Sequence, residues 1–70
     1  MVAIVTNNIQ EYFGYLEEHK LSQKDCIFVN NSRHVVGRRF THVEFLYHAQ
    51  YIPQKEMNVI MEYLDSHLEK

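Results

Sequence analysis

The sequence contains few of the residues that reinforce small proteins. Of its 70 residues, one is cysteine, two are glycine, one is proline and none is tryptophan. The single cysteine, Cys26, excludes an internal disulfide. No apolar run approaches the roughly 20 residues of a membrane-spanning helix, and the first residues lack the basic start and apolar core of a secretory signal. We therefore expect a cytoplasmic protein that does not contact a membrane.

The composition indicates one small globular domain covering residues 1–70. Apolar residues make up 46% of the chain and charged residues 23%, which is a balance typical of a folded protein rather than a disordered one. A domain of this length buries only about 60% of the surface that its unfolded chain exposes, so its core is marginal. Because small folds gain stability from a partner subunit, we expect a homodimer.

Two segments have the apolar spacing of amphipathic helices. The first runs from Thr6 to about Lys20, with Thr6, Asn7 or Asn8 as the N-cap. The last begins near Pro53 or Gln54, because proline suits the first position of a helix. The apolar stripe of this last helix consists of Met57, Ile60, Met61, Leu64 and Leu68.

Between these segments the pattern is typical of a β-hairpin. Residues 26–29 are an apolar run, residues 30–33 have the composition of a turn, and residues 34–36 resume an apolar strand. If the side chains after residue 36 continued to alternate between the two faces of the strand, an arginine would lie on the core face. A bulge at Gly37 would correct this by turning Val35 and Phe40 inward. Alternatively, the strand ends at Val36 and a turn follows.

Residues 42–51 fit either a helix or a third strand. Thr41 and Glu44 have the spacing of a capping box, which favours a short helix. Val43, Phe45 and Tyr47 alternate as they would in a strand. We favour the helix because the capping signal is local and specific. The predicted fold is then α+β, in the order α-β-β-α-α, with the helices packed on one face of the β-hairpin.

Charge is unevenly distributed along the chain. The formal net charge of −2 combines seven basic and nine acidic residues. No acidic residue lies between Asp25 and Glu44, whereas that stretch holds three arginines and two histidines. We expect His34 and His42 to titrate near neutrality. The predicted partner-binding residues are these basic side chains and two tyrosines that follow them: Arg33, His34, Arg38, Arg39, His42, Tyr47 and Tyr51.

These residues favour a binding or regulatory protein that is not an enzyme. The arginine fork pairs with carboxylates or phosphates, and tyrosine and arginine are enriched at binding hot spots. We expect a protein partner with an acidic surface. The alternative is a nucleic acid whose phosphates contact the same arginines, with a dimer doubling their number. The size is also typical of modulators encoded by phages or mobile elements.

No pattern of a catalytic or metal site accompanies these residues. His42 and His48 are six residues apart, or about 240° around a helix. Cys26 has no second cysteine at a metal-binding spacing. The two glycines are too far apart in the chain to form a phosphate-binding loop. We therefore expect no metal, no cofactor and no catalytic residue.

Overall fold

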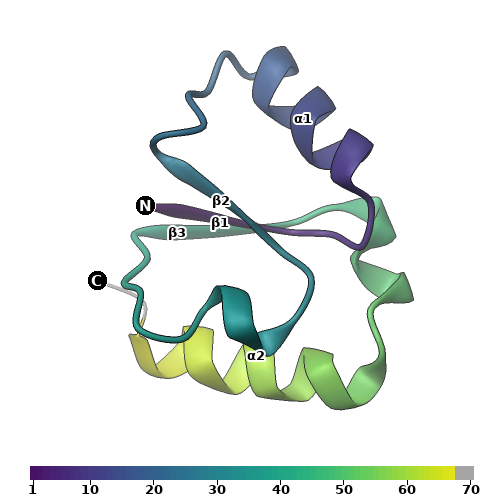
Figure 1. Ribbon diagram of the computed structural model, residues 1–70, viewed down its shortest axis with the longest axis vertical. Helices are drawn as coiled ribbons and strands as arrows, with labels where there is room; N and C mark the ends of the chain where they lie inside the picture. The colour runs from purple at the N-terminus through teal and green to yellow at the C-terminus, as the bar shows by residue number, and fades with distance from the viewer. Residues whose placement is uncertain (68–70) are drawn as a thin grey trace.

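The computed structural model describes residues 1–67, which form a three-stranded sheet between two α-helices (Figure 1). The mixture of helices and strands predicted from the sequence is confirmed. In chain order the elements are β1 (Val2–Val5), α1 (Ile9–Glu18), β2 (Cys26–Val29), the 3₁₀ helix η1 (Ser32–His34), β3 (His42–Phe45), the 3₁₀ helix η2 (Tyr47–Tyr51) and α2 (Gln54–His67).

The central strand is β1, at the start of the chain. The strand order is β2-β1-β3, and β1 is parallel to both neighbours, with Val5 opposite Val29 on one side and Phe45 on the other. Strands that are covered on both faces of a parallel sheet read as continuous apolar runs. Residues 2–5 are such a run, and three of its four side chains are fully buried.

Each face of the sheet is covered by one of the two connections between parallel strands. The chain passes from β1 through α1 to β2, then returns past β1 to β3. Right-handed crossovers that run in opposite directions along a sheet must use opposite faces. Tyr12 and Leu16 of α1 accordingly pack on one face, whereas Val35 and Phe40 of the second connection pack on the other with α2. Figure 1 shows α1 above the sheet and α2 below it.

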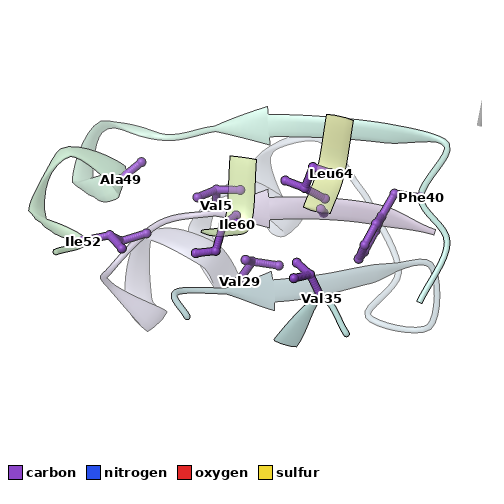
Figure 2. Packing of buried hydrophobic residues seen from close by; sticks show 9 residues of the cluster. Val5, Val29, Val35, Phe40, Ala49, Ile52, Ile60 and Leu64 are labelled. Atoms are coloured by element: carbon purple, nitrogen blue, oxygen red, sulfur yellow. The ribbon is translucent and has the colours of Figure 1, made fainter. Parts of the chain in front are cut away.

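The larger core lies between the sheet and α2 (Figure 2). Its buried residues are Ala3, Val5, Val29, Val35, Phe40, Ala49, Ile52, Ile60 and Leu64. The smaller core, between the sheet and α1, consists of Ile4, Tyr12, Leu16 and Cys26. None of the helices within residues 1–67 has the length and apolarity that crossing a bilayer would require.

The predicted hairpin is wrong, and with it the α-β-β-α-α order. β2 pairs with β1, and the chain after β2 forms η1 and a turn instead of a returning strand. A lone hairpin is marginally stable, whereas pairing with β1 places Cys26–Val29 in a sheet that is covered on both faces. Asn31 accepts a hydrogen bond from the Arg33 N–H at 2.9 Å and thereby starts η1. Gly37, with φ of 77°, lies in a turn rather than in a bulge.

The prediction of a helix at residues 42–51, which was based on the capping box, is also wrong. Residues 42–45 are β3 because β1 has a second edge that needs a partner. The alternative interpretation as a strand is correct as far as Phe45, after which η2 begins. Both long helices are confirmed. Asn8 caps α1 by accepting bonds from the Gln10 and Glu11 N–H groups at 2.9 and 3.1 Å, and Leu68 lies outside the described residues.

Candidate functional site

The strongest candidate site lies where the parallel strands end. After β1 the chain turns to the α1 face, and after β3 it turns to the α2 face. The two loops therefore diverge at the carboxyl ends of neighbouring strands, on the right of Figure 1. In open sheets with helices on both faces, ligands bind at this kind of position. We call this side of the sheet the carboxyl edge, and the opposite side the amino edge.

Glu11 joins the two diverging loops at the carboxyl edge. Its Oε1 accepts hydrogen bonds from the Thr6 hydroxyl at 2.7 Å and from the His48 N–H at 3.0 Å. Its Oε2 lies 2.7 Å from His48 Nδ1. Thr6 is fully buried, so its hydroxyl depends on this acceptor. One carboxylate in the first turn of α1 thus fixes the start of η2, 37 residues later in the chain.

The same contacts set the charge of Glu11 and the orientation of His48. Burial acts to raise the pKa of Glu11, but hydrogen bonds from Thr6 and His48, together with the charge of His48, hold it below the ordinary glutamate value. An ionised carboxylate only accepts hydrogen bonds, so His48 Nδ1 carries the proton in this contact. His48 Nε2 is then the ring atom that remains for a ligand.

Three rings on η2 form a group that we call the aromatic surface: Tyr47, His48 and Tyr51. The Tyr47 and Tyr51 ring centroids lie 6.1 Å apart, and the His48 centroid lies 5.2 Å from the first and 5.7 Å from the second. A side-chain hydrogen bond with Tyr47 raises the pKa of Tyr51. Tyr47 is 67% exposed and Tyr51 58% exposed. The three rings therefore contact one another; the two tyrosines leave most of their area exposed, whereas His48 is half-buried.

Asn7 fixes the backbone beneath the aromatic surface. Its N–H donates to the His48 carbonyl at 3.2 Å, and its side-chain amide donates to the Tyr51 carbonyl at 3.1 Å. Beside the surface, α1 and η2 enclose an open hollow of about 380 Å³. It is lined by Glu11, Gly14, Tyr15, Glu18, Leu46 and Tyr47.

The structure divides the binding residues predicted from the sequence into two groups. Arg33 and His34 lie in η1, which follows β2 at the carboxyl edge, where Tyr47 and Tyr51 also lie. Arg38 and Arg39 lie in the connection that returns to the amino edge, and His42 begins β3 there. Within residues 1–67, none of the three arginines forms an ion pair with a carboxylate.

His34 does not behave as expected from the sequence. Burial lowers its pKa, and the nearby charge of Arg38 lowers it further. Its Nδ1 lies 3.3 Å from the Asn30 N–H and accepts a hydrogen bond from it, as only an unprotonated nitrogen can. The expectation that His34 titrates near neutrality is corrected: the folded state holds it neutral to lower pH. His34 therefore adds less positive charge to residues 33–42 at neutral pH than its ordinary pKa would give.

Sequence reasoning missed most of the residues that organise the carboxyl edge: Thr6, Asn7, Glu11 and His48. Assigning residues 2–5 as a strand would have placed the polar run 6–8 at its carboxyl end, where sites gather. Nothing in the sequence signals that His48 contacts Glu11. Cys26 is buried in the structure, and burial raises the pKa of its thiol.

In the part of the chain that the structure describes, no three His, Cys, Asp or Glu side chains are grouped to hold a metal ion. Comparison with protein-family models, with curated proteins and with solved structures gives no match.

Proposed function

We propose that this chain is a non-enzymatic binding protein that engages a protein partner through its carboxyl edge. The observation that carries the proposal is the aromatic surface, in which two largely exposed tyrosines project from a short helix whose backbone is fixed to α1 and β1. Tyr47 and Tyr51 are the anchors of this interaction. Large rings that are exposed on a fixed backbone are the residue type and setting that dominate binding energy at protein interfaces.

Preorganisation is the reason that this surface is favoured over the other exposed apolar residues. Binding is weakened by the cost of ordering side chains and loops at the interface. At η2 much of that ordering is already present in the folded chain, because Glu11 holds His48 and Asn7 holds the Tyr51 carbonyl. Tyrosine has few rotatable bonds, so little additional freedom is lost when it contacts a partner.

The position and charge of Arg33 favour a protein partner with an acidic surface. Arg33 lies at the same edge as the tyrosines and forms no ion pair within residues 1–67. Asn7 connects the two sides of this edge: Asn30 Nδ2 donates to its Oδ1 at 3.5 Å, while its own amide donates to Tyr51. Arg38 and Arg39 are displaced toward the amino edge, where they steer an acidic partner rather than contact it.

The proposal is tested by quantitative capture from extracts of the native cell. The Tyr47→Ser/Tyr51→Ser variant is compared with the wild type and with Val36→Ser/Val59→Ser, which removes exposed apolar side chains outside the aromatic surface. We expect a partner that the wild type and the control retain and the tyrosine variant loses. If all three proteins capture the same set in the same amounts, the proposal is wrong.

Nucleic-acid binding is the second candidate function, supported by three arginines that form no ion pair within the described residues. It predicts capture that nuclease abolishes and an affinity that falls log-linearly with salt concentration. The Arg38→Gln/Arg39→Gln variant would weaken such binding more than Tyr47→Ser/Tyr51→Ser would. The protein partner is favoured instead if the wild type still captures its partner after nuclease treatment and the Tyr47→Ser/Tyr51→Ser variant does not capture it.

A further inference from the structure

The outer edge of β3 is an exposed strand edge with no partner in residues 1–67. Figure 2 shows β1 between β2 and β3, so β3 ends the sheet on its side. Exposed edges pair readily with another chain unless lysine, proline or a bulge obstructs them. Residues 42–45 contain neither lysine nor proline, and Phe45 is 49% exposed. This edge is therefore open to a further strand.

The direction of the backbone groups shows which residues would pair. The Leu46 N–H donates to the Val5 carbonyl at 3.0 Å, so the backbone of Leu46 faces β1. Backbone groups alternate sides along a strand. Glu44 therefore also faces β1, and the N–H and carbonyl groups of Val43 and Phe45 point outward.

An apolar hollow continues from this edge toward α2. It measures about 170 Å³ and is lined by Val43, Phe45, Met61, Leu64 and Asp65. Met61 is half exposed beside it. A strand added at the β3 edge would extend the sheet over this hollow and cover side chains that now face solvent.

We propose that a second copy of this chain pairs with β3 in antiparallel orientation, with Val43 opposite Val43 of the second copy. The two-fold relation makes the contact self-complementary and closed. It joins two three-stranded sheets into one of six strands and brings the two α2 helices to the same face. The inference does not depend on the proposed partner surface, because this edge includes neither Tyr47 nor Tyr51.

The charged side chains of β3 favour a second copy of this chain as the partner, and they also determine which residues of the two copies lie opposite each other. In a symmetric antiparallel pair, the middle of one β3 strand lies beside the middle of the other. Two registers do this while keeping both α2 helices on the same face of the joined sheet: Val43 opposite Val43, or Glu44 opposite Glu44. The second sets like charges directly against each other, which is destabilising. The first sets His42 of each copy against Glu44 of the other. His42 and Glu44 already hydrogen-bond to each other on one face of β3 within a single copy. The same two groups can therefore form a hydrogen bond when they face each other across the two copies.

The first test is the association state in solution, measured by sedimentation equilibrium. We expect the wild type to be a dimer and Phe45→Lys to raise the dissociation constant about tenfold or more, because it places charge on both strand edges. Phe13→Lys is the matched control, since Phe13 is similarly exposed at 45% but lies on α1. A monomeric wild type, or equal dissociation constants for the two lysine variants, would overturn the proposal.

The second test reads the register by disulfide formation in a Cys26→Ala background. Residues directly opposite in an antiparallel pair are within disulfide reach, whereas diagonal residues about 7–8 Å apart exceed it. We therefore expect oxidation to link Val43→Cys chains into dimers and to leave Glu44→Cys chains unlinked. Linkage of Glu44→Cys without linkage of Val43→Cys would show that the register is wrong. Failure of both to link would contradict pairing at β3.

Discussion

Long-range backbone hydrogen bonds join both the carboxyl edge and the amino edge of the sheet, but the carboxyl edge depends on side-chain hydrogen bonds as well. At the carboxyl edge, the side chains of Glu11 and Asn7 connect segments that are distant in the sequence. At the amino edge, the long-range bonds end on backbone carbonyls: the Val2 N–H donates to Asp25 at 2.7 Å and the Thr41 N–H donates to Met1 at 2.9 Å. Substitutions should therefore disturb the carboxyl edge far more than the amino edge.

The largest expected effect is that of Glu11→Ala. It removes the acceptor of a fully buried hydroxyl and of the His48 N–H, and leaving such groups unpaired costs roughly 2–3 kcal/mol. We expect a loss of that size in the free energy of unfolding, measured by urea denaturation. Glu17→Ala, an exposed glutamate on the same helix, should change it by no more than about 0.5 kcal/mol. Equal losses would show that Glu11 has no special role.

Acid should weaken the carboxyl edge through the same residue. Because the folded state lowers the pKa of Glu11, its ionised form stabilises the protein above the ordinary glutamate pKa of about 4.3. That contribution is lost as pH falls through the folded pKa. We expect the unfolding free energy of the wild type to fall more steeply below about pH 4 than that of Glu11→Gln. Parallel pH profiles for the two proteins would contradict the assignment.

A smaller effect is expected where α1 begins. The Asn8 side chain accepts two N–H groups of the first turn, and replacing such a cap with alanine costs about 1 kcal/mol. Asn8→Ala should therefore lower the melting temperature, whereas Asn8→Asp keeps an acceptor and should preserve it. If the alanine and aspartate variants melt at the same temperature, the cap contributes nothing to stability.

The smallest effect is expected toward the amino edge. Arg38→Ala/Arg39→Ala should change the unfolding free energy by no more than about 0.5 kcal/mol, because neither side chain forms an ion pair within residues 1–67. Urea denaturation of the double variant measures this directly. A loss above about 1 kcal/mol would mean that these arginines stabilise the fold.

The sequence predicts the helices better than the sheet, for a physical reason. Helix signals are local: the cap at Asn8 and the stripe containing Ile60 and Leu64 can be read from neighbouring residues. Strand pairing is not local. Residues 26–29 and 42–45 are too short to show which strand they join, and both pair with residues 2–5, far away in the chain. The turn-forming asparagines after residue 29 therefore suggested a hairpin that the sheet does not contain.

The candidate site was predictable only in part for the same reason. Tyr47 and Tyr51 could be identified from their residue type and position, and the structure brings their rings together. The arginines were grouped because they are close in sequence, but the connection from β2 to β3 carries them from one edge of the sheet toward the other. The contact of Glu11 with His48 spans 37 residues and depends on where β3 ends.

Preorganisation of the carboxyl edge is tested most directly by amide hydrogen exchange of the wild-type protein. The His48 N–H donates to Glu11, whereas the Arg39 N–H has no hydrogen-bond partner within residues 1–67. Slow exchange at His48 together with fast exchange at Arg39 would show that η2 is held in place before any partner binds. Equally fast exchange at both amides would contradict a preorganised binding surface.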